Sequence, residues 1–191
     1  MARSNTIVST FTTKTGQKAS IRYAQADDAA DLTEFINTFS LEDSFTRFSG
    51  EQLTLQEEVE YLQSEVQKMK DGDAVKLFCY SNAKLAGVCD IHRDTSLLTR
   101  RRHAGILGLI VSEKFRGQGI GERLVHATMA EANRIISGLR MITLTCFATN
   151  DPAITLYKKL GFSEVGRIPN MLLHKKKYVD EIIMIKNLDS K

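Results

Sequence analysis

Apolar residues recur at helical intervals in two long segments of the chain. Behind Thr54 and Glu57, which match a capping box, apolar side chains repeat every three or four residues until Gly72 ends the pattern. The second segment, residues 120–136, has one apolar face and an opposite face of glutamate and arginine side chains. We expect each segment to be a helix that buries its apolar stripe.

Other apolar runs are too short for helices and predict strands. Residues 75–80 and 85–91 are separated by Ser81-Asn82-Ala83-Lys84, which predicts a hairpin. The run at 104–111 is apolar on both faces, as expected of a central strand that is buried on both sides. Further strands are predicted at 20–23, 141–147, 164–167 and 178–185.

Together with a short helix capped by Asp27 and another after Asn150, these segments follow the order β-α-α-β-β-β-α-β-α-β-β. This order predicts an α/β (α+β) fold, a mixed sheet with helices on both faces. No repeat or linker divides the chain, so we expect residues 19–191 to be a single domain. Residues 1–18 are polar and rich in serine and threonine, and we expect a flexible N-terminal segment there.

The most informative motif follows the predicted central strand. Three glycines, Gly117, Gly119 and Gly121, follow that strand and lead into the predicted helix over residues 120–136. Such a turn directs free backbone N–H groups to one point, where the positive end of the helix dipole adds to them. A phosphate or pyrophosphate is therefore the expected ligand, although a glycine-rich segment of this kind can also be an ordinary loop.

Of three known phosphate-binding motifs, only one matches this loop. The G-x-G-x-G rhythm differs from the dinucleotide fingerprint, and Gly121-Glu122-Arg123 lacks the Lys-Ser/Thr of a P-loop. Arg116-x-x-Gly119-x-Gly121 instead resembles the acyl-CoA pyrophosphate loop of the GCN5-related N-acetyltransferase (GNAT) superfamily. A second motif, Asn150 to Phe162, is similar to the superfamily signature N-x-x-A-x-x-L-Y-x-x-x-G-F. The resemblance extends over about residues 19–187.

The resemblance implies a mostly antiparallel, twisted sheet of six to seven strands and an acyl-CoA-dependent N-acetyltransferase. It implies acetyl-CoA as the cosubstrate and no metal. The cosubstrate-binding residues it implies are Leu109, Ile110, Val111, Arg116, Gly117, Gln118, Gly119, Ile120, Gly121, Asn150, Ala153 and Tyr157. The pantetheine arm would lie along the edge of residues 109–111.

Tyr157 matches the family's general acid, which protonates the departing CoA thiolate. A phenol suits this role because its ordinary pKa lies slightly above that of a thiol. Without the motif, Tyr157 would be read as one more member of an apolar helix stripe. Asn150 matches a residue that contacts CoA, and it is also placed to cap its helix.

The general base is less evident, because residues 104–111 carry no ionisable side chain. His103, at the entrance of that strand, is the nearest candidate, with a water chain as the alternative. Glu42 and Asp43 lie where the family shapes its acceptor pocket, so they are candidates to bind an ammonium group or are a solvated turn. The basic runs Arg100–Arg102 and Lys175–Lys177 are either solvated or attract an anionic group of the ligands.

Composition narrows the choice of function. A net charge of +3, from 26 basic and 23 acidic residues, gives no sign of a nucleic-acid binder. No apolar run approaches the length of a membrane span. The three cysteines lie in strand-like apolar surroundings, as expected of free thiols in a reducing, cytoplasmic protein. Cys89 and His92 alone are too few ligands to predict a zinc site.

The segment Tyr178 to Met184 also resembles GNAT branches that acetylate small amines or amino acids. This resemblance implies acetyl transfer to a small primary amine such as an amino acid, in a ternary complex. Two alternatives stay open: acetylation of a protein N-terminus or lysine, and acyl-CoA binding without catalysis. The sequence also leaves a homodimer open.

Overall fold

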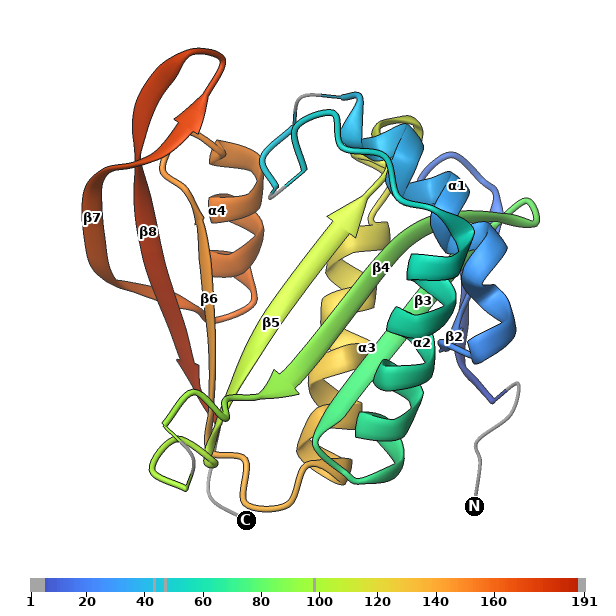
Figure 1. The fold of residues 1–191 in the computed structure, drawn as a ribbon, viewed down its shortest axis with the longest axis horizontal. Helices are drawn as coiled ribbons and strands as arrows, with labels where there is room; N and C mark the ends of the chain where they lie inside the picture. Colours follow the sequence, from blue (N-terminus) through green and yellow to red (C-terminus); the bar gives the residue numbers. More distant parts are fainter. Residues whose placement is uncertain (1–5, 43, 47, 98, 189–191) are drawn as a thin grey trace.

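The computed structural model describes residues 6–42, 44–46, 48–97 and 99–188. Over these residues, eight strands form one sheet in the order β1-β2-β3-β4-β5-β6-β8-β7 (Figure 1). Only β5 and β6 are parallel, and every other neighbouring pair is antiparallel. The strands are β1 (Ile7–Thr12), β2 (Lys18–Tyr23), β3 (Ala74–Ser81), β4 (Lys84–Arg93), β5 (Ala104–Val111), β6 (Met141–Phe147), β7 (Ser163–His174) and β8 (Lys177–Asn187). The mixed, mostly antiparallel sheet is confirmed, with one strand more than the largest number expected.

Helices cover both faces of the sheet, as the sequence predicts. One face carries α1 (Ala29–Ser40) and α2 (Leu55–Lys70), and the other carries α3 (Ile120–Ile135) and α4 (Asp151–Lys159) (Figure 1). Short 3-10 turns precede α1 at Ala26–Asp28 and follow β5 at Glu113–Phe115. No helix in the described part of the chain is long and apolar enough to cross a bilayer.

The alternation of side chains along the strands separates two cores. On β3, Leu77 and Cys79 pack in the cluster with α3, whereas Phe78 packs in the cluster with α1 and α2. Thr54 and Glu57 form the predicted capping box at the start of α2. Asn82 and Ala83, both with positive φ, make the tight turn of the predicted β3–β4 hairpin.

The prediction of a flexible N-terminal segment is wrong for residues 7–18. Residues 7–12 form β1, which pairs with β2, and the residues between them form a turn. Val8 and Phe11 pack against the core on the α3 side, so this strand buries apolar surface despite its serine and threonine content. The sequence signal was the row of β-branched and aromatic residues, which favours a strand over a flexible start.

β5 and β6 pair only near their N-terminal ends. The pairing joins Ala104 to Met141 and ends with Ile106 opposite Thr143, after which the two strands diverge (Figure 1). The expectation that 104–111 is buried on both faces is therefore wrong: Ile106 is 47% exposed, and residues 108–111 are only half-buried. The divergence opens a cleft at the centre of the sheet.

Candidate active site

A cavity of about 1020 Å³ lies at this divergence. Its walls include residues 106–111 of β5, residues of α1, α2, β3 and β4 on one side, and residues of β6 and α4 on the other. Of the predicted cosubstrate-binding residues, all except Gln118 line it. The structure thus brings the two sequence motifs together at one cavity.

The glycine loop forms one end of the cavity and leads directly into α3. Gly117 and Gly119 have φ values of 73° and 85°, the left-handed region that favours glycine. Gly119 is the N-cap of α3, and a Cβ placed there would meet only the Lys14 side chain, at 3.9 Å. Its backbone therefore borders open space at the positive end of a 16-residue helix, the arrangement expected for an anion.

Gln118 has a structural part in this loop. Its side-chain amide donates to the carbonyl of Lys114 at 2.9 Å, and its Oε1 accepts from the Thr15 hydroxyl at 2.9 Å. These bonds fasten the loop to itself and to the β1–β2 turn.

Lys14, in the β1–β2 turn, is a residue that the sequence analysis missed. It lines the cavity, and its backbone N–H donates to the carbonyl of Gln118 at 3.2 Å. Its ammonium is therefore supplied to the glycine loop by a segment about one hundred residues away in the sequence. The sequence predicts a flexible segment over residues 1–18 and therefore gives no signal for Lys14.

Arg116 and Glu42 bind each other. The Arg116 guanidinium donates to the Val111 carbonyl at 2.9 Å and pairs with the Glu42 carboxylate. Glu42 also accepts from the backbone N–H of Glu113 at 3.2 Å, and it is not among the described residues lining the cavity. Glu42 thus ties the α1–α2 loop to the glycine loop, and the structure does not place it to bind an amine. Asp43 lies outside the described residues.

Tyr157 lies on α4 and faces the cavity, although it is only 7% exposed. Its ring packs edge-on against Phe162 at 5.9 Å between centroids. Burial raises the pKa of Tyr157, and the neighbouring Cys89 and Cys146 thiols add to the effect, so the phenol keeps its proton at neutral pH. Asn150 caps α4 by accepting from the backbone N–H of Ala153 at 3.3 Å, as predicted, and it also lines the cavity.

His103 is exposed at the N-terminal end of β5, and it is not among the described residues that line the cavity. The structure therefore does not support it as the base. The run Arg100–Arg102 is at the same end of the strand, where Arg101 pairs with Asp94 at 3.2 Å. Lys175 and Lys176 form the tight turn between β7 and β8.

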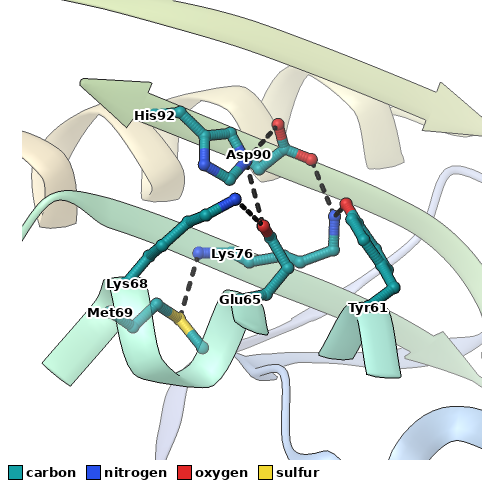
Figure 2. Close-up of polar contacts among 7 residues, drawn as sticks. All are labelled: Tyr61, Glu65, Lys68, Met69, Lys76, Asp90 and His92. Carbon is teal, nitrogen blue, oxygen red and sulfur yellow. Dashed lines mark hydrogen bonds and ion pairs between the residues drawn. The ribbon is translucent and has the colours of Figure 1, made fainter. Parts of the chain in front are cut away.

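The wall formed by α2, β3 and β4 holds a cluster of charged and polar side chains that the sequence did not predict (Figure 2). Lys76 donates to Asp90 Oδ2 at 2.8 Å and to the Tyr61 hydroxyl at 2.9 Å. His92 Nε2 lies 3.2 Å from Asp90 Oδ1 and 3.0 Å from Glu65 Oε2. We call these five residues, Tyr61, Glu65, Lys76, Asp90 and His92, the charged cluster.

The members of the charged cluster stabilise one another's ionised forms. Burial alone would neutralise Lys76, but the Asp90 carboxylate outweighs it and raises the pKa of Lys76. Burial likewise acts against the Asp90 charge, yet Lys76 and His92 hold the pKa of Asp90 well below its usual range. For His92, bonds to Asp90 and Glu65 overcome burial and raise its pKa to about 9. At neutral pH, Lys76 and His92 are cations and Asp90 is an anion.

A signal for this cluster was present in the sequence. Asp90 lies on the predicted strand 85–91 and His92 directly follows it, two residues further on, so their side chains share one face if the strand continues. Lys76 interrupts the neighbouring apolar run, and charged residues inside such runs are rarely buried without partners. The sequence did not reveal that these three residues would meet.

The raised pKa of His92 predicts a loss of stability in mild alkali. Because the folded value of about 9 exceeds the ordinary value of 6.5, the stabilisation is complete below about pH 6.5 and is lost as the pH rises through 9. The difference corresponds to at most about 3 kcal/mol of unfolding free energy. Chemical denaturation from pH 6 to 10 would measure it.

The matched variants for this measurement are His92→Gln and His126→Gln, the second on the exposed face of α3. We expect His92→Gln to flatten the decline and His126→Gln to keep it. An equal decline in all three proteins would contradict the assignment.

Comparisons with known proteins agree with this geometry. Residues 37–162 match the family described as the Acetyltransferase (GNAT) family. An N-alpha-acetyltransferase of Sulfurisphaera tokodaii is 28% identical over 152 residues, 80% of this chain and 84% of that protein. An L-amino acid N-acetyltransferase of Escherichia coli is 31% identical over 91 residues, 48% of this chain and 56% of that protein.

A GNAT acetyltransferase of Streptococcus pneumoniae has a similar solved structure. Its TM-score is 0.81 at 29% identity, over 90% of this chain and 99% of that one. The chain belongs to the GNAT acetyltransferase family. It is an acyl-CoA-dependent N-acetyltransferase, and acetyl-CoA is its cosubstrate.

Proposed function

We propose that this enzyme transfers the acetyl group of acetyl-CoA directly to the primary amine of a small molecule, such as an amino acid. Both substrates would occupy the cavity at the divergence of β5 and β6. The amine nitrogen attacks the thioester carbonyl carbon, so that a C–N bond forms as the C–S bond breaks.

The glycine loop and the free edge of β5 would hold the cosubstrate. Backbone N–H groups of residues 116–121 would bind the pyrophosphate at the N-terminus of α3. The pantetheine arm would lie along Leu109–Val111, where β6 has diverged. A backbone N–H of this strand would polarise the thioester carbonyl, a contribution that is often the largest in acyl transfer.

Tyr157 would donate a proton to the departing thiolate. Its pKa is raised by burial, and the thiolate leaves in the same buried surroundings, which also disfavour its charge. Because β5 carries no ionisable side chain and His103 lies outside the cavity, we propose that water in the cavity takes the proton from the amine.

The observation in favour of a small acceptor is an aromatic bridge over the cavity. Phe45, in the α1–α2 loop, packs against Phe147 of β6 at 5.6 Å and against His174 of β7 at 4.5 Å, measured between ring centroids. Phe45 itself lines the cavity. These contacts join the α1–α2 side of the cleft to the β6–β8 side, so a long peptide would have to separate them.

The test is release of CoA thiol from acetyl-CoA with a panel of acceptors: the twenty L-amino acids, ethylamine, isoamylamine and a hexapeptide with a free N-terminal alanine. We expect the highest kcat/KM with one of the small amines. A clear preference for the hexapeptide would favour the second candidate, acetylation of protein N-termini. The name of the Sulfurisphaera tokodaii relative is the reason for including it.

The glycine loop gives the first prediction about binding. Gly119→Val puts a branched side chain at φ 85° and into the space assigned to the pyrophosphate. We expect the dissociation constant of acetyl-CoA, measured by calorimetry, to rise at least about tenfold.

Gly138→Val is the matched control for strain. Gly138 has a similar φ of 73° and open space around it, but it is not among the described residues lining the cavity. This variant should bind acetyl-CoA as the parent does. Normal binding by Gly119→Val would show that the loop is not the pyrophosphate site.

Lys14 gives a second binding prediction. Removing its ammonium in Lys14→Ala should weaken acetyl-CoA about fivefold at low salt and less at high salt, because ionic contacts at an open surface are screened. Lys18→Ala, at the other end of the same turn, is the control. Equal affinities of the two variants at low salt would rule out a contact between Lys14 and the cosubstrate.

A further inference from the structure

The charged cluster borders a gap in the wall of the cavity. Asp90 on β4 is the direct neighbour of Gly108 on β5. Two residues away in each direction, on the same face of the sheet, Val88 pairs with Ile110 and His92 pairs with Ile106. Because Gly108 has no side chain, the Asp90 carboxylate reaches over β5 at this rung. A Cβ at residue 108 would lie 3.0 Å from Asp90 Oδ1.

The place of this gap is close to the expected thioester. Gly108 immediately precedes Leu109, the first residue of the strand edge assigned to the pantetheine arm. Asp90, Gly108, Leu109 and Tyr157 all line the same cavity. β5 has no acid of its own, and Asp90 supplies a carboxylate over the middle of that strand from the neighbouring one.

The carboxylate is fixed in position but still able to accept further hydrogen bonds. Lys76 holds Oδ2, and His92 lies beside Oδ1, so Asp90 cannot turn away without breaking both contacts. Each carboxylate oxygen has a second lone pair, and the side chain is 19% exposed. The cluster therefore has a charged acceptor facing the cavity.

We propose that Asp90 binds the ammonium group of the acceptor and holds its nitrogen beside the thioester. This inference rests on the proposed function and specifies its substrate class: a primary alkylammonium compound with an apolar body. The next pair on the same face of the sheet supplies the apolar surface, since Val88 and Ile110 pack with Phe48 in one cluster and all three line the cavity.

Asp90 stays a carboxylate throughout the proposed acetyl-transfer reaction. The ammonium gives one proton to water in the cavity, and the neutral amine then attacks the carbonyl carbon. Tyr157 protonates the sulfur as the C–S bond breaks, and the second proton lost from the nitrogen restores Tyr157 through water. The products are the N-acetyl amine, CoA thiol and one proton released to solvent.

In this proposal Asp90 contacts the acceptor and not acetyl-CoA. Its loss should therefore change the KM of the acceptor but not the affinity for acetyl-CoA. Gly108→Ala places a methyl group against the fixed carboxylate. Lys76→Gln/Asp90→Asn removes the charge and also neutralises its buried partner. We expect each variant to raise the KM of the best small-molecule acceptor in the panel at least about tenfold, while the acetyl-CoA dissociation constant changes less than about twofold.

Gly166→Ala, on β7, is the control, because a Cβ there makes only ordinary contacts with Ile183. It should match the parent in both constants. If either Gly108→Ala or a folded Lys76→Gln/Asp90→Asn keeps the parent KM for the acceptor, the role of Asp90 is refuted. If the double variant does not fold, Gly108→Ala decides. Absence of turnover by the parent with every amine would instead refute the proposed function, and this inference with it.

Discussion

Replacing Tyr157 by phenylalanine is expected to lower the kcat of acetyl transfer by about 10²–10³-fold, the range for losing one proton-transfer group. The departing thiolate would then have to leave as an anion in a buried site, or wait for a proton from water. Acetyl-CoA affinity should change little, because the ring and its packing are retained. Steady-state turnover and calorimetric binding measure the two quantities.

The control for this variant is Phe162→Leu. This change removes the phenylalanine ring that packs against Tyr157 but keeps the Tyr157 hydroxyl. We expect it to lower stability and to reduce kcat far less than Tyr157→Phe does. If kcat falls equally in the two variants, the packing of the Tyr157 ring, and not its hydroxyl, accounts for the loss of activity. Unchanged turnover in Tyr157→Phe would leave Tyr157 with a packing role only.

The second large effect concerns the charged cluster. Asp90→Asn alone removes the counterion of Lys76, whose side chain is only 4% exposed. An unpaired buried ammonium is costly, and we expect the free energy of unfolding at pH 7 to fall by about 3–5 kcal/mol. Urea denaturation followed by circular dichroism would measure the change.

Replacing both partners should cost much less than replacing Asp90 alone. Lys76→Gln/Asp90→Asn leaves two neutral amide groups that can still hydrogen-bond, so we expect it to recover most of the lost stability. Lys76→Gln completes the double-mutant cycle. Additive effects of the two single changes would mean that the pair contributes no coupling energy.

The sequence predicted the parts of the fold that depend on local pattern. Thr54 and Asn150 cap their helices as expected, because a cap needs only its own backbone and a side chain nearby. The sheet with helices on both faces followed from the order of the elements. The N-terminal strand was missed because Ile7–Thr12 is polar at several positions, and its stability comes from β2 and from the core.

The site was less predictable because it depends on strand register. The glycine loop and Tyr157 belong to compact motifs, and the structure places both at one cavity. Lys14, Lys76 and Asp90 come from separate strands and turns, so only the pairing of those strands brings them to the same cavity. Glu42 is a sequence candidate for binding an ammonium group or for a solvated turn, but in the structure Arg116 binds it, a contact between residues 74 positions apart.

The short junction between β5 and β6 would make acetyl-CoA a component of the architecture as well as a reagent. Three residue pairs connect the five strands β1–β5 to the three strands β6, β8 and β7. If the pantetheine arm lies along Leu109–Val111, it supplies hydrogen bonds in the stretch where the protein's own pairing stops. The bound cosubstrate would then stabilise the junction between β5 and β6. The rigidity of the enzyme would therefore increase with the concentration of acetyl-CoA.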